Sequence, residues 1–178
     1  MIFFDTETTG LLSPSLTKVE LQPFITEIYA IRLDENFNFV NEINTLVKPP
    51  IPIPEIVTKL TGITDDHVKD APAFIEIYDS LCELFIGERE LVAHNASFDV
   101  NVLRWELTRH NFELKFPWPI VHTCTVEKSY SIENRRLKLS DLHLLATGKE
   151  HSEKAHRAKE DVMALIRSYI WLKKEGYV

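Results

Sequence analysis

The chain lacks several features that would assign it to common classes of protein. Only two cysteines occur in 178 residues, Cys82 and Cys124, and no Cys-x-x-Cys pair is present, so we expect neither a disulfide framework nor a structural zinc site. No apolar run approaches the roughly 20 residues of a membrane span. An apolar strand is predicted to begin at residue 2, which leaves no room for a signal peptide. We therefore expect a cytoplasmic protein with no membrane partner.

Basic residues are absent before Lys18, and charge is spread unevenly over the rest of the chain. Residues 1–127 carry 9 Lys and Arg against 20 Asp and Glu, a balance of −11. Residues 128–178 carry 11 against 7, a balance of +4, so the net charge is −7. A basic final third can supply phosphate contacts in an acidic protein, although such a split is also common on a solvated surface.

The N-terminal stretch combines an apolar run with two acids. Ile2–Phe4 predicts a central strand that is buried on both faces, and Asp5 and Glu7 stand at its end. In an extended chain both carboxylates point to one side, so they repel one another and lose hydration. Their missing positive charge is either a distant basic side chain or a bound cation, and carboxylate oxygens suit magnesium or manganese.

Hydrophobic periodicity predicts strands and helices in a defined order along the chain. Strands are expected at 25–33 and 37–47, joined as an antiparallel hairpin, and at 90–94 and 120–123. Helices are expected at 54–62, 71–86, 95–110, 140–148 and from 156 onward, with Asn95 capping the third of them. This order predicts one α/β domain over residues 1–178, with a mixed five-stranded sheet flanked by helices.

Three further residues have chemistry that fits the acidic strand end. Asp99 follows the strand at 90–94, where an acid alone is more often structural because a helix N-terminus favours it. Asp161 lies on the inward stripe of the last helix and needs a partner, which a divalent cation shared with Asp5 and Glu7 would supply. His156 could take a proton from metal-bound water. These residues predict two-metal cleavage of a phosphodiester. The rest of the stripe comprises Val162, Leu165, Ile166, Tyr169, Ile170 and Leu172.

Three motifs in order resemble those of a known family. Residues 5–10 (Asp-Thr-Glu-Thr-Thr-Gly), 94–99 (His-Asn-Ala-Ser-Phe-Asp) and 156–161 (His-Arg-Ala-Lys-Glu-Asp) are similar to the motifs of the DEDD-type 3′-to-5′ exonucleases, histidine subclass. That subclass includes the proofreading epsilon subunit and ribonuclease T. Tyr29 stands where the family usually has a small residue, so we expect different packing behind the first strand.

The resemblance implies a ribonuclease-H-like fold and assigns a role to each site residue. Asp5 would bridge two Mg²⁺ or Mn²⁺ ions, Glu7 and Asp161 would bind the nucleophile's metal, and Asp99 would serve the second metal through water. His156 would be the general base, and the products would be nucleoside 5′-monophosphates. The candidate substrate contacts are Thr8 and Leu11 at the terminal nucleotide, with His94, Asn95 and Phe98 at the phosphate and the outer wall.

Several alternatives stay open at this point. We prefer single-stranded DNA with a free 3′ end as substrate, with RNA or short oligoribonucleotides as the alternative. A non-catalytic nucleic-acid or polymerase-binding module of the same fold would have a broken site, and a structural protein would need three accidental motifs. No extension follows Val178, so we expect a free-standing enzyme. The sequence does not decide whether a polymerase or a second copy of the chain binds it.

Overall fold

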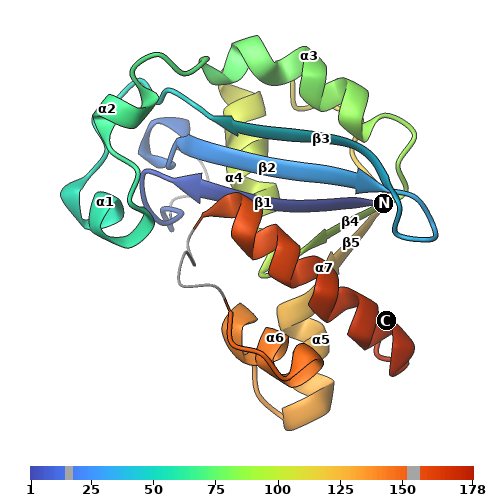
Figure 1. The fold of residues 1–178 in the computed structure, drawn as a ribbon. Coiled ribbons are helices and arrows are strands. Elements are labelled where there is room, and N and C mark those ends of the chain that lie inside the picture. Colours follow the sequence, from blue (N-terminus) through green and yellow to red (C-terminus); the bar gives the residue numbers. More distant parts are fainter. Residues whose placement is uncertain (15–17, 152–156) are drawn as a thin grey trace.

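The computed structural model describes residues 1–14, 18–151 and 157–178, and in them five strands form one mixed sheet. The strand order is β3-β2-β1-β4-β5 (Figure 1). β1 pairs antiparallel with β2, which pairs antiparallel with β3, while β4 and β5 run parallel to β1. The predicted mixed five-stranded sheet is therefore confirmed. The strands are β1 (Ile2–Thr8), β2 (Ile25–Leu33), β3 (Phe39–Leu46), β4 (Glu90–Ala93) and β5 (Val121–Cys124).

Helices cover both faces of the sheet, and the alternation of residues along β1 separates the two layers. Ile2 and Phe4 are fully buried under α3 (Phe74–Phe85) and α4 (Ala96–Arg109). Phe3 is buried on the other face, against α7 (Ala158–Lys174), which crosses in front of β1 in Figure 1. Because the side chains of a strand alternate, Asp5 and Glu7 lie on the same face as Phe3, the face covered by α7.

The remaining helices include two that the periodicity did not predict. α2 (Asp65–Val68) is a single turn, in which the Thr64 hydroxyl accepts a hydrogen bond from the His67 amide. α5 (Thr125–Glu133) buries two small hydroxyl side chains, Thr125 and Ser129, and so carries no apolar stripe that would reveal it. No helix of the described residues is long and apolar enough to cross a membrane. The other helices are α1 (Glu55–Thr61), α6 (Leu139–Thr147) and a 3-10 turn at Val19–Leu21.

One local prediction was wrong and another holds only in part. Asn95 is the N-cap residue of α4, as predicted, but it adopts the left-handed conformation, with φ 71°, and its side chain makes no capping hydrogen bond. Its backbone carbonyl instead accepts a hydrogen bond from the Phe98 amide at 2.8 Å. Ile170 is 40% exposed, because it lies at the margin of the α7 stripe. Tyr29 is buried beside Phe3 in the core under α7, and its hydroxyl donates to Glu42.

Candidate active site

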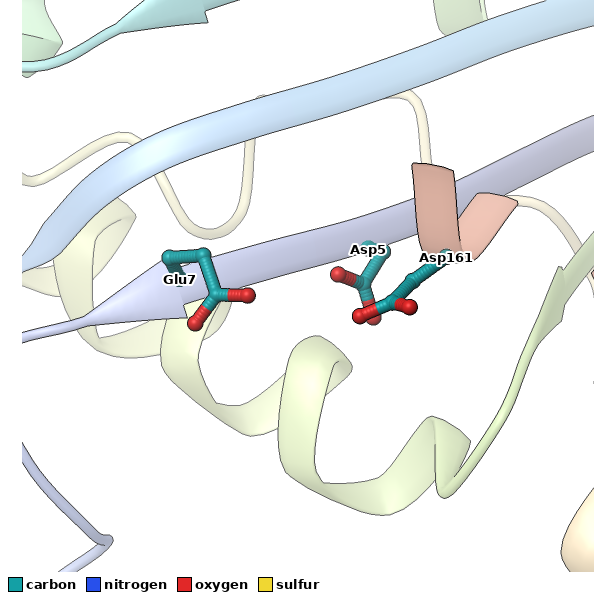
Figure 2. Close-up of side chains that lie close together, drawn as sticks. All are labelled: Asp5, Glu7 and Asp161. Carbon is teal, nitrogen blue, oxygen red and sulfur yellow. The ribbon is translucent and has the colours of Figure 1, made fainter. Parts of the chain in front are cut away.

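Three of the predicted site residues meet at the carboxyl end of β1. Asp5 and Glu7 come from β1 and Asp161 from the first turn of α7 (Figure 2). One carboxylate oxygen from each lies within 4.8 Å of the other two. Oxygens at this spacing can contact one divalent cation, because magnesium and manganese bind oxygen at roughly 2 Å. The fold therefore brings together acids that are 156 positions apart in sequence.

The strand register and the start of α7 position these acids. Glu7 lies opposite Glu27 of β2, so their side chains share one face of the sheet. The Glu27 carboxylate accepts a hydrogen bond from the Ala158 amide at 3.1 Å, which fixes the beginning of α7 against β2. The Asp161 amide then donates to the Arg157 carbonyl at 3.1 Å, within the first turn. Packing of α7 over Phe3 directs Asp161 toward Asp5.

Burial and mutual repulsion perturb the site carboxylates strongly. Burial is the main cause of a pKa of Asp5 well above its usual range, and the charges of Asp99, Asp161, Glu7 and Glu27 raise it further. Burial likewise raises the pKa of Glu7 to about 8, helped by Asp161 and Glu27 and opposed by Arg157. Both shifts favour the protonated carboxyl group in the metal-free protein. Binding of a divalent cation would therefore compete with protons.

Asp99 approaches the strand from the opposite side. It lies on α4, and its Oδ1 accepts hydrogen bonds from the Thr6 amide at 3.0 Å and the Thr6 hydroxyl at 2.8 Å. Burial raises the pKa of Asp99 to about 7, while the two bonds from Thr6 lower it. Asp99 is not part of the three-carboxylate group of the described residues. Its hydrogen bonds from Thr6, the residue after Asp5 in β1, nevertheless hold it beside the site, and its charge raises the pKa of Asp5.

Two basic side chains lie close to the acids. The Arg157 guanidinium binds Glu27, with Nη2 at 2.6 Å from Oε1 and Nε at 3.0 Å from Oε2. His151 Nε2 lies 2.8 Å from Asp161 Oδ1, and its side chain is buried. His156, the predicted general base, lies outside the described residues. Sequence reasoning missed His151, because it stands in a connection without periodicity and reaches Asp161 only through the fold.

An apolar cleft of about 450 Å³ opens on one side of Glu7. This volume is within the range of small-ligand sites, about 300–1,000 Å³. Leu11 is 86% exposed there and Ile56 77%, so large apolar side chains face solvent beside an acidic centre. The predicted contacts Thr8, Leu11 and Phe98 all line this cleft; the contribution of α1 was not predicted. The residues that line the cleft include Glu7, Thr8, Leu11, Ile56, Leu60 and Phe98.

A polar hollow of about 680 Å³ opens on the side of Asp5 and Asp161. The predicted contacts His94 and Asn95 line it, together with the basic residues Arg136 and Lys138. His94 Nδ1 lies 2.9 Å from the Thr125 hydroxyl, and burial lowers the pKa of His94 to about 4. The imidazole is therefore neutral at physiological pH. The structure thus divides the five predicted substrate contacts between two surfaces on either side of the acids.

Two solved structures with the same architecture are exonucleases. Exonuclease X in complex with 5′-overhanging duplex DNA matches with a TM-score of 0.68 and 24% identity, over 99% of this chain and 93% of that chain. The nuclease domain of 3′hExo, a DEDDh family member bound to rAMP, matches with a TM-score of 0.75 and 18% identity, over 98% and 92%. The chain therefore has the ribonuclease-H-like exonuclease fold.

The family follows from the sequence comparison. The profile of the exonuclease family RNase_T matches residues 2–169, and the chain belongs to this family. The PolC-type DNA polymerase III of Lactococcus lactis is 31% identical over 159 residues, 87% of this chain and 9% of that protein. That of Clostridium perfringens is 32% identical over 165 residues, 92% and 10%. The chain thus spans about a tenth of these relatives. The predicted family and the prediction of a nuclease are confirmed.

Proposed function

We propose that the protein removes nucleotides from the 3′ end of nucleic acid and releases nucleoside 5′-monophosphates, with single-stranded DNA as its preferred substrate. The observation that carries this proposal is the meeting of Asp5, Glu7 and Asp161 within 4.8 Å. The PolC-type relatives are DNA polymerases, and the exonuclease X structure contains DNA, which favours DNA. RNA is the alternative, since another structural neighbour recognises the 3′ end of a histone mRNA stem-loop.

The donor set fits hard divalent cations. Carboxylate oxygens are the ligands that magnesium and manganese prefer. Burial, and after it the neighbouring acids, raises the pKa of Asp5 and Glu7, and a bound cation would offset both effects. Asp5, Glu7 and Asp161 would hold one Mg²⁺ or Mn²⁺, and Asp5 with Asp99 a second. Bound ions would activate water and stabilise the charge that develops on the phosphate. Thr6 restrains the Asp99 carboxylate in place through its two hydrogen bonds.

The two surfaces beside the acids suit the two parts of a nucleic-acid 3′ end. The apolar cleft would take the terminal base, with Leu11 and Phe98 against its faces and Thr8 beside the sugar. The polar hollow would take the preceding phosphates, because Arg136 and Lys138 line it and both are exposed. Neither of these two side chains takes part in an ion pair between described residues. The scissile phosphate would then lie over the carboxylates.

A histidine would hold the proton that leaves the attacking water. His156 is the residue that the third motif assigns to this role, and it immediately precedes Arg157. His151 is a second candidate, because its Nε2 lies 2.8 Å from Asp161 Oδ1. A base within hydrogen-bond reach of the nucleophile accepts its proton as the bond to phosphorus forms. Substituting each histidine separately distinguishes the two.

The assay uses 5′-labelled single strands of DNA and RNA, incubated with Mg²⁺, with Mn²⁺ or with chelator. We expect a ladder that shortens stepwise from the 3′ end only when metal is present, with DNA degraded faster. A strand blocked at its 3′ end is the control and should persist. Persistence of every strand under both metals would refute the proposal. Cleavage starting within the strand would refute its exonucleolytic part.

We further infer the setting in which the activity operates. Residues 1–178 would form a single exonuclease domain that acts in the cytoplasm on free 3′ ends. The PolC-type relatives are far longer, so a polymerase is the partner to test first, against a free-standing enzyme or a homodimer. Sedimentation of the protein alone and with a replicative polymerase separates these cases.

A further inference from the structure

Glu27, which is buried, and Arg157, which is exposed, form an ion pair at the edge of the acidic site. Three hydrogen bonds join the guanidinium to the carboxylate: Nη2 to Oε1 at 2.6 Å, Nε to Oε1 at 3.1 Å and Nε to Oε2 at 3.0 Å. The Ala158 amide adds a fourth bond to Oε2 at 3.1 Å. The Glu27 side chain is 4% exposed and that of Arg157 46%. Glu27 is therefore fixed, whereas Arg157 reaches it from the surface.

This guanidinium also lies close enough to act on the carboxylates proposed to bind metal. Glu27 and Glu7 are direct partners across β1 and β2, where like charges destabilise one another. The charge of Arg157 lowers the pKa of Glu7, and Glu7 raises that of Arg157. Arg157 stands one helical turn before Asp161, whose amide donates to its carbonyl. A guanidinium can bind any of these carboxylates through two parallel hydrogen bonds.

We propose that Glu27 is a positioning residue that holds the Arg157 guanidinium away from Asp5, Glu7 and Asp161 and so keeps their oxygens available to divalent cations. The inference rests on the proposed metal centre. Because the Ala158 amide fixes the Glu27 carboxylate, Arg157 has a better partner in Glu27 than in Glu7. In Glu27→Gln, the guanidinium would turn to the neighbouring carboxylates. There it would occupy oxygens that a metal needs, and its charge would repel the ion.

A purely structural ion pair is the alternative. In that case the pair would only attach α7 to β2, and loss of either partner would displace Asp161. The two readings differ in the double variant. Removal of Arg157 from a protein that already lacks the Glu27 charge would relieve the competition, whereas it would restore nothing if the pair served only to attach the helix.

The test measures Mn²⁺ binding to the metal-free protein by calorimetry, without substrate. We expect Glu27→Gln to raise the dissociation constant for Mn²⁺ about tenfold or more, which is the scale of coupling between adjacent charged groups. The double variant Glu27→Gln with Arg157→Gln should bind within about threefold of wild type. Wild-type affinity in Glu27→Gln, or a double variant as weak as Glu27→Gln, would overturn the inference. Absence of Mn²⁺ binding to wild type would instead refute the metal centre itself.

Two further variants control for folding. Glu106 matches Glu27 closely: it is buried, it pairs with Arg109 at 3.1 Å and it accepts the Ile25 amide at 2.8 Å. Glu106→Gln should therefore lower the melting temperature without weakening Mn²⁺ binding. If Glu27→Gln fails to fold, Arg157→Gln decides alone. Mn²⁺ affinity within about threefold of wild type, or tighter, supports the inference, and weaker binding overturns it.

Discussion

Glu7 and Glu27 are opposite one another in the sheet, yet their surroundings differ. Glu27 accepts hydrogen bonds from the Arg157 guanidinium and the Ala158 amide. Glu7 lies in the group with Asp5 and Asp161, and burial with these charges raises its pKa to about 8. The fold can therefore neutralise a buried carboxylate with a side chain of its own. It does so for Glu27 but concentrates negative charge one strand away, as a cation-binding site requires.

We expect the largest effect from removing a charge from the group of Asp5, Glu7 and Asp161. Asp5→Asn should lower kcat by about 10³-fold, because a bound metal contributes several kcal/mol to the transition state. Without metal, the same variant should melt higher, by about 2–4 °C for each kcal/mol of repulsion removed. Steady-state kinetics and thermal melts in chelator test both effects. Asp141→Asn, which changes an acid paired with Arg135 at the surface, is the control and should alter neither.

The next largest effect concerns the two histidines near Asp161. His156→Ala should lower kcat by about 10²-fold, which is the scale of general base catalysis, with little change in substrate affinity. His151→Ala should have a smaller effect if His156 is the base. Single-turnover rates over pH 6–9 assign the role. A larger loss of kcat in His151→Ala than in His156→Ala would identify His151, which contacts Asp161, as the general base.

The apolar cleft should contribute to binding more than to the chemical step. Leu11→Ser should raise KM about tenfold, because base stacking on apolar side chains contributes about 1–3 kcal/mol per base. Leu114 is 99% exposed and lines neither the cleft nor the hollow, so Leu114→Ser is the matched control. Equal KM values for the two variants would show that the terminal base does not bind in the cleft.

The polar hollow should contribute a smaller, salt-dependent part of the affinity. Arg136→Gln with Lys138→Gln should raise KM severalfold and reduce the salt dependence of binding by about one to two phosphate contacts. Arg135 bonds to Glu133 and reaches Asp141, so Arg135→Gln is the control. Fluorescence anisotropy of a labelled strand, recorded in the presence of Ca²⁺ from 50 to 200 mM salt, measures how steeply the binding affinity falls with salt. An unchanged salt dependence in the double variant would show that the strand does not bind in the polar hollow.

The smallest expected effect is that the stability of the metal-free protein depends on pH. The folded pKa of Glu7 is about 8, against 4.5 for the ordinary group, so the folded state holds a proton that the unfolded state has lost. Stability should therefore be highest below pH 4.5 as far as Glu7 is concerned, and it should fall as pH rises to 8. Melting in chelator at pH 5, 6.5 and 8 tests this. Addition of Mn²⁺ should reverse the trend.

Local patterns predicted the parts of the site that depend on local geometry. Asp5 and Glu7 share a face because strand side chains alternate, and Asp161 lies on the inward stripe of its helix. Pairing between distant segments was not accessible in this way. Glu27 stands in a strand with a mostly apolar face, and only the fold brings it to Arg157. α5 was missed because its buried side chains are small and polar.

Calorimetric titration of the metal-free protein with Mn²⁺ at pH 7, in buffers of different ionisation enthalpy, tests the central claim most directly. We predict that the wild type binds at least one ion per chain and releases protons as it does so, because burial raises the pKa of Asp5 and raises that of Glu7 to about 8. Asp5→Asn should bind far more weakly. Heat that matches dilution alone up to millimolar Mn²⁺, or equal binding by Asp5→Asn, would contradict the account.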